Sequence, residues 1–305
     1  MKYKRQLTYL IPLIAVLSLF AAGVGVFYQT PGEPYPFTSV RGEQVTINGR
    51  GIYGYDTVSS TAQMQANDLI TLVLGLPLLV IATLLAFRDD PRSAWPLRGR
   101  LLLTGTLGFF LYTYMSMATN TAFNNLFPVY VTLFSLSLYA FIMAMMSFDL
   151  AGLPGRFSEH LPRGWIAGLL IFAGAFLTLA WLGGRVLPPI LQGTMPLLEN
   201  CTTMVIQTMD LGLLVPLAFL AGILLLRRNA WGYLLSAVVV MKMLTMGVAV
   251  STMGINMARN GTPDSPVIVG IFIGITLVNI VLAVFLLKDV RAEGEAVGER
   301  YPLAV

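Results

Sequence analysis

The sequence predicts an all-α polytopic membrane protein, an eight-helix transmembrane bundle with a small extracytoplasmic β-hairpin. Three observations predict this fold. The mean hydropathy of the 305-residue chain is +0.75, only 11% of its residues are charged, and its apolar residues gather in long runs. Since soluble domains carry about a quarter charged residues, these observations exclude a soluble enzyme, a disordered tail and a nucleic-acid-binding protein.

The apolar runs have the length that a bilayer requires. A transmembrane helix needs about 20 mainly apolar residues to cross about 30 Å of hydrocarbon. Helices satisfy all backbone polar groups within the segment, whereas barrel strands would show segments of about ten alternating residues. The predicted spans are approximately residues 7–28, 68–87, 101–119, 126–147, 165–183, 204–226, 231–253 and 266–287.

The first span follows a basic N-terminus, which is also typical of a secretory signal peptide. Residues 21–23 (Ala-Ala-Gly) offer a cleavage site. The apolar run continues through Val26 and Phe27 beyond that site, so an uncleaved first helix is favoured and a cleaved signal is the alternative.

The basic residues of the loops predict the orientation. With the N-terminus in the cytoplasm, 14 of the 19 Lys and Arg residues fall in cytoplasmic segments and four fall outside, while Lys242 lies within a span. This asymmetry follows the positive-inside rule. We therefore expect a plasma (inner) membrane protein with both termini cytoplasmic. Its net charge of +4 reflects the loops, and its expected partner is the lipid bilayer, not nucleic acid.

The largest segment outside the membrane is the loop at 29–67. Val45 and Ile47 alternate with polar residues, and Asn48-Gly49 is typical of a two-residue hairpin turn. We therefore predict a β-hairpin over Gln44–Tyr55 that lies above the outer mouth of the bundle. It is either a packed cap, or a lid or docking surface.

The chain contains no segment that predicts a catalytic domain. It has no P-loop, H-E-x-x-H, G-x-S-x-G or D-x-D motif, and one Cys and one His argue against a metal cluster. We expect no metal and no cofactor, and an enzyme is the least favoured class. Residues 1–305 form a single transmembrane domain whose cytoplasmic tail, 288–305, is predicted to be disordered.

Two ionisable residues lie inside predicted spans, Asp210 in the sixth and Lys242 in the seventh. Each costs roughly 2.5–3.5 kcal/mol at a span centre and marks a candidate functional site. The tight turn at 227–230 makes these spans antiparallel neighbours and places Lys242 level with residue 215. Asp210 is then about 7–8 Å farther along the axis, so a direct or water-linked pair is feasible.

Other polar residues fall at the same level of the bundle. Gln207 lies about one turn from Asp210 on the sixth span, and Tyr112 and Asn120 lie near the outer end of the third. Together with Asp210 and Lys242 they predict a polar cavity that opens outward. The hypothesis is binding or transport of a small solute or ion.

The same residues have a structural interpretation. A buried Asp–Lys pair can serve only to fix which helices pair and in what register. The 15 Met residues are more often adaptable packing than ligands. The alternative function is therefore a non-catalytic subunit, assembly factor or sensor of a membrane complex.

Span eight contains a literal G-x-x-x-G at Gly270 and Gly274. This motif permits close helix approach. It serves either packing within the bundle or a homodimer contact.

Three stretches resemble a group of uncharacterised bacterial multi-pass proteins. They are Val40–Val58, Phe127–Leu138, and Asp210-Leu-Gly followed by Leu224–Arg228. The resemblance runs along most of the chain and implies eight spans. It implies no activity and no functional residues.

Overall fold

The structure is a computed structural model that describes residues 1–90 and 92–292. Within these residues, eight helical segments are long and apolar enough to cross a membrane, as predicted. Their bounds are α1 (Lys4–Phe27), α2 (Val58–Ile70) with η1 (Thr71–Gly75) and α3 (Leu76–Ala86), α4 (Trp95–Asn120), α5 (Phe127–Met145), α6 (Arg163–Thr178) with η3 (Leu179–Val186) and α7 (Leu187–Gln192), α8 (Val205–Met209) with η4 (Asp210–Leu214) and α9 (Val215–Leu226), α10 (Ala230–Arg259) and α11 (Pro266–Lys288). The remaining helical element is a 3₁₀ turn, η2 (Pro154–Arg156).

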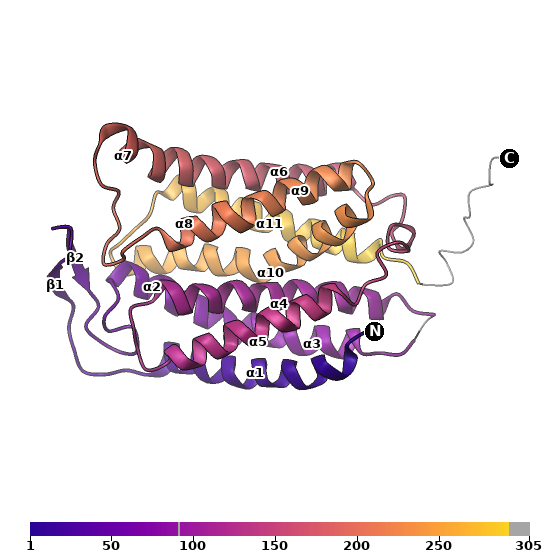
Figure 1. Cartoon of the computed structure of the whole chain (residues 1–305), viewed down its shortest axis with the longest axis horizontal. Coiled ribbons are helices and arrows are strands. Elements are labelled where there is room, and N and C mark those ends of the chain that lie inside the picture. The colour runs from indigo at the N-terminus through magenta and orange to yellow at the C-terminus, as the bar shows by residue number, and fades with distance from the viewer. Residues whose placement is uncertain (91, 293–305) are drawn as a thin grey trace.

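The helices form two halves in chain order (Figure 1). α1 to α5 pack against one another in one half, and α6 to α11 pack in the other. α10 joins the halves, because it packs against both α4 and α2. The spans of α4 and α10 are accordingly the two most deeply buried.

The two ends of the bundle differ. The N-terminus and the last turn of α11 lie at one end, here called the inner end, whereas β1, β2 and α7 lie at the opposite, outer end (Figure 1). Trp95, Trp165 and Trp231 each lie within the first three residues of a helix that starts at the inner end, and each is about half or more exposed. Exposed tryptophans at one level are typical of a membrane–water interface.

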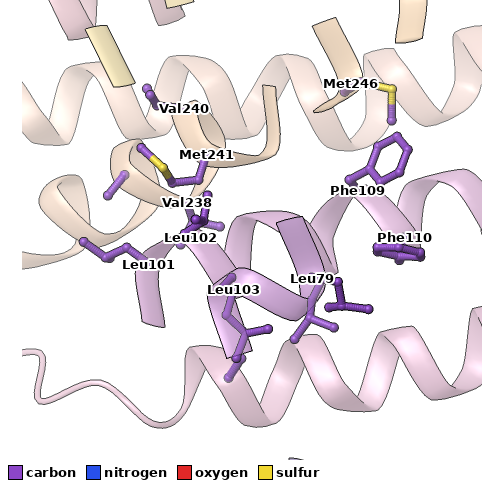
Figure 2. Packing of buried hydrophobic residues seen from close by; sticks show 14 of the residues in the cluster. Leu79, Leu101, Leu102, Leu103, Phe109, Phe110, Val238, Val240, Met241 and Met246 are labelled. Atoms are coloured by element: carbon purple, nitrogen blue, oxygen red, sulfur yellow. The ribbon is translucent and has the colours of Figure 1, made fainter. Parts of the chain in front are cut away.

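The seam between the halves is apolar and tightly packed. Figure 2 shows leucines and phenylalanines of α3 and α4 against Val238, Val240, Met241 and Met246 of α10. Gly105 permits this contact, since a Cβ atom there would lie 2.7 Å from the Lys242 backbone nitrogen. Gly105 therefore allows α4 and α10 to approach each other closely.

Three spans contain a π-helical segment just before a proline. η1 ends at Gly75, two residues before Pro77, and η4 ends at Leu214, two residues before Pro216; η3 ends two residues before Pro188. A proline ring clashes with the carbonyl four residues earlier, and the wider π turn removes that carbonyl from the clash. Such segments occur frequently at functional sites.

The predicted hairpin is wrong in its pairing. The strand at Gln44–Ile47 (β2) exists, but it pairs antiparallel with β1 (Tyr35–Thr38), not with residues 52–55. The Asn48 side chain donates a hydrogen bond to the Arg50 carbonyl, and its backbone N–H donates to the Asp56 carbonyl. These bonds close residues 48–56 into a compact loop, so Asn48-Gly49 does not connect two strands.

The compact loop, rather than the strands, is the packed part of the outer segment. Its Tyr53 and Asp56 are buried, whereas most of β1 and β2 is exposed. Arg41 beside β2 donates hydrogen bonds to the carbonyls of Cys201 and Thr202. The two long outer loops are thereby fastened together.

The second span begins ten residues earlier than predicted. Thr57 caps it, its hydroxyl accepting a hydrogen bond from the Ser60 backbone N–H at 3.1 Å. Its first turns are polar, which is why hydropathy alone did not include them. Asp68 therefore lies within the span.

The predicted disorder of the tail concerns mainly residues 293–305, which lie outside the described residues. The described start of the tail is packed. Arg291 donates a backbone hydrogen bond to the Arg156 carbonyl at 2.8 Å, and Val290 forms a β-bridge with Phe157.

Candidate solute-binding cavity

A cavity of about 220 Å³ lies between the two halves, toward the outer end. Its walls come from α2, α4, α6, η3, α8, η4, α10 and α11. Three of the five predicted site residues line it: Asp210, Tyr112 and Asn120. The other polar lining residues are Ser60, Gln63, Asn67, Thr113, Ser116, Trp181 and Asp264.

Asp210 is the first residue of η4 and is 6% exposed. One carboxylate oxygen accepts a hydrogen bond from the Tyr112 hydroxyl at 2.5 Å, and the other accepts one from Trp181 Nε1 at 2.8 Å. The donors come from α4 and η3. Two neighbouring spans therefore fix this carboxylate in the cavity wall.

Lys242 lies behind Tyr112, outside the cavity lining. Its Nζ is 4.5 Å from the centre of the Tyr112 ring and has no hydrogen-bond partner among the described residues. A desolvated cation over an aromatic face gains about 2 kcal/mol.

The two charges are therefore linked through Tyr112, which holds Asp210 by its hydroxyl and Lys242 by its ring face. No direct ion pair joins them in the described part of the chain. Asp210 and Lys242 lie on neighbouring helices as predicted, but the bridging role of Tyr112 between them was not predicted.

Gln207 does not belong to the cavity. It is half-buried on α8, and the described lining does not include it. The residue that α8 contributes to the lining is Ile206.

The outer mouth of the cavity carries a second carboxylate. Asp264 lies just before α11, and its oxygen is 3.9 Å from the Arg185 guanidinium at the end of η3. Asn120 lies at the same level, at the end of α4.

The rest of the lining is apolar and rich in methionine. Met side chains adapt their shape and are polarisable, so this wall suits a partly apolar guest. The methionines are Met64, Met117, Met243, Met246, Met253 and Met257, and Phe272 and Leu177 add to them.

Trp181 was not predicted, and its one weak signal is a tryptophan that lies within a span and not at its end. Asp68 was expected above the polar cavity or at its level but was not predicted as a site residue, because the predicted span began at that residue. Among the described residues, no group of three or more His, Cys, Asp or Glu side chains could hold a metal ion.

Comparisons of the chain with models of protein families, with curated proteins and with solved structures find no match.

Proposed function

We propose that this protein binds a small solute in the outer-half cavity and moves it across the membrane. The observation that carries the proposal is the Asp210 carboxylate, which is buried within a span, lines the cavity and is fixed by Tyr112 and Trp181. An ionisable residue at such a depth is costly and marks a functional site by default.

The lining favours a solute with a cationic or hydrogen-bond-donating group and an apolar part. Asp210 and Asp264 supply negative charge, and the described lining contains no Lys, Arg or His. Each Asp210 oxygen accepts one protein hydrogen bond and keeps capacity for another. Trp181 adds an aromatic ring to the lining, and aromatic rings attract cations.

The membrane assignment extends this proposal. The excess of basic residues at the inner end and the tryptophans at that level support an inner end in the cytoplasm. We propose the plasma membrane of a bacterium as the location, with both termini cytoplasmic, in line with the resemblance to bacterial multi-pass proteins.

Binding can be measured without a known solute, because Trp181 lines the cavity. Replacing Trp95, Trp165 and Trp231 by Phe leaves Trp181 as the sole tryptophan. We expect at least one member of a panel of small organic amines to change its fluorescence saturably. Asp210→Asn should weaken binding about tenfold or more, which corresponds to about 1.4 kcal/mol, whereas the exposed inner-end variant Asp90→Asn should not.

Binding that is equal in Asp210→Asn, or saturable changes only with anionic solutes, would contradict the proposed site. The fluorescence of the single-Trp protein without solute serves as the folding control.

A second candidate function, a subunit, assembly factor or sensor, is favoured by α11. Gly270 and Gly274 are exposed, and no described atom lies within 4 Å of where their Cβ atoms would be. The motif is therefore not used for packing inside the bundle and is available to another helix.

Mass spectrometry of the protein extracted in native lipid separates the candidates. A second protein at equal stoichiometry would favour the subunit. A homodimer that Gly270→Leu with Gly274→Leu disrupts would assign α11 as a self-contact and leave the solute proposal standing.

A further inference from the structure

Two carboxyl groups are buried outside the cavity and have no cationic partner. Asp56 ends the compact outer loop and Asp68 lies in α2, and each is 2% exposed. No ion pair within the described residues includes either of them. An unpaired buried carboxylate costs several kcal/mol, so these positions call for a bound cation, of which the proton is the smallest.

Tyrosine hydroxyls connect this region. The Tyr53 hydroxyl donates to Asp68 Oδ2 at 2.5 Å and lies 3.4 Å from the Tyr130 hydroxyl. Tyr130, on α5, interacts electrostatically with both Asp56 and Asp68. The backbone N–H of Ala122 donates to Asp56 Oδ1 at 2.8 Å.

Hydrogen-bonding capacity remains unused at the same place. Asp56 Oδ2 and the Tyr114 hydroxyl are buried and have no hydrogen-bond partner among the described residues. The Tyr114 ring stacks on Tyr130, with centroids 6.4 Å apart. Each unmade bond costs about 1–3 kcal/mol, and a proton on Asp56 Oδ2 turns that oxygen into a donor.

Asp56 lies where such a proton can exchange with the outer solvent, because it belongs to the outer loop. Burial raises the pKa of Asp56 to about 7, against the opposing effect of the Ala122 N–H. The titratable groups that face Asp56 are Tyr130 on α5 and Cys201 on the second outer loop, next to Glu199. Those that face Asp68 are Tyr53, Tyr130 and Tyr114.

We propose that Asp56 and Asp68 form a proton-binding site that is loaded from the outer side, with the hydroxyls of Tyr53 and Tyr130 beside Asp68. Loading forms one O–H bond on a carboxylate oxygen, and the proton comes from the outer solvent. The carboxylate is thereby neutralised, and return of the proton to the solvent restores its charge.

The site adjoins the cavity through α2, where Asn67, the neighbour of Asp68, lines the cavity. A change in the state of Asp68 therefore acts on the helix that forms one cavity wall. This coupling of proton and solute rests on the proposed function; the binding of the proton does not.

Infrared spectroscopy of the full-length protein in lipid nanodiscs tests the site directly, because protonated carboxyl groups have a separate C=O stretching band. We expect a band that disappears as the pH is raised through about 7. Asp56→Asn should remove this titrating component and Asp68→Asn should remove a second one. Tyr53→Phe should shift the second, since it removes the hydrogen bond to Asp68, and the exposed Asp90→Asn should change neither.

The proposal is overturned if the wild type shows no carboxyl band that titrates near neutral pH. It is also overturned if Asp56→Asn and Asp68→Asn both show the same carboxyl bands as the wild type. Should Asp56→Asn not fold, Asp56→Glu keeps the acid and moves it, so the titrating band must shift. Loss of amine binding with an intact titrating band would refute only the proposed solute site.

Discussion

Asp56 makes a direct prediction at the scale of single residues. Its pKa rises from 3.8 to about 7 because the folded protein buries it. The folded state then holds a proton that the unfolded state releases between these values, so stability falls as the pH rises from about 4 to about 7. The shift corresponds to at most about 4 kcal/mol.

Unfolding in mild detergent at a series of pH values measures this linkage. The decline in the wild type should be steeper than in Asp56→Asn, whose amide does not titrate. Parallel pH profiles for the two proteins would show that Asp56 does not contribute.

The hydroxyl of Tyr112 is predicted to stabilise the protein through its hydrogen bond to Asp210. Tyr112→Phe removes the hydroxyl bond to Asp210 and keeps the ring under Lys242. Because a hydrogen bond to a charged group contributes about 1.5–3 kcal/mol, we expect a loss of that order. In a double-mutant cycle with Asp210→Asn, the changes in unfolding free energy should be non-additive by about 1 kcal/mol or more. Additive changes would show that Tyr112 and Asp210 do not interact.

At the scale of elements, Pro216 and η4 determine where Asp210 points. Pro216→Ala removes the ring that disfavours a regular helix here, so we expect η4 to shorten to an α-helix. Asp210 would then rotate away from Trp181. Amine binding measured by Trp181 fluorescence should weaken about tenfold while the protein stays folded.

Pro12→Ala in α1 is the matched control for Pro216→Ala, since Pro12 also lies inside a helix but far along the chain from the site. Equal effects of the two substitutions on amine binding would contradict a specific role of η4.

Gly105 and Gly168 make a matched pair in the packing of helices. Alanine at Gly105 meets the backbone of α10, whereas no described atom lies within 4 Å of a Cβ at Gly168. Gly105→Ala should cost about 1–3 kcal/mol of unfolding free energy through overpacking. Gly168→Ala should be neutral or stabilise by up to about 1 kcal/mol, and similar losses in both would argue against a tight α4–α10 seam.

The elements also show how far sequence reasoning reaches. Span number follows from length and hydropathy, which are local properties, and it is confirmed. The pairing of β2 and the start of α2 were wrong, because Asn48 closes a loop by side-chain bonds and the first turn of α2 is polar. Neither the closed loop at Asn48 nor the polar first turn of α2 can be predicted from the spacing of apolar residues.

The site was predictable only where one turn controls the geometry. The tight turn at 227–230 places Asp210 and Lys242 on neighbouring helices, so their proximity followed from counting. Trp181 reaches Asp210 through the packing of a third span and two π segments. This tertiary contact cannot be predicted from the spacing of residues along the sequence.

At the scale of the whole molecule, two halves meet at α10 and enclose a cavity whose lining carries carboxylates and no cationic side chain among the described residues. This arrangement predicts an outward-facing space that attracts cations. Attraction of cations is therefore the general property of the cavity, and binding of a particular solute depends on it.

The most direct test is the reactivity of a cysteine placed in the cavity. In a Cys201→Ser background, Ser116→Cys lines the cavity and Asn125→Cys lies exposed in the outer turn. Two membrane-impermeant thiol reagents of equal size, one cationic and one anionic, are added from outside. The account predicts that the cationic reagent is favoured at Ser116→Cys about tenfold more than at Asn125→Cys, and that Asp210→Asn reduces this preference. No reaction at Ser116→Cys from outside, or a preference for the anionic reagent, would contradict it.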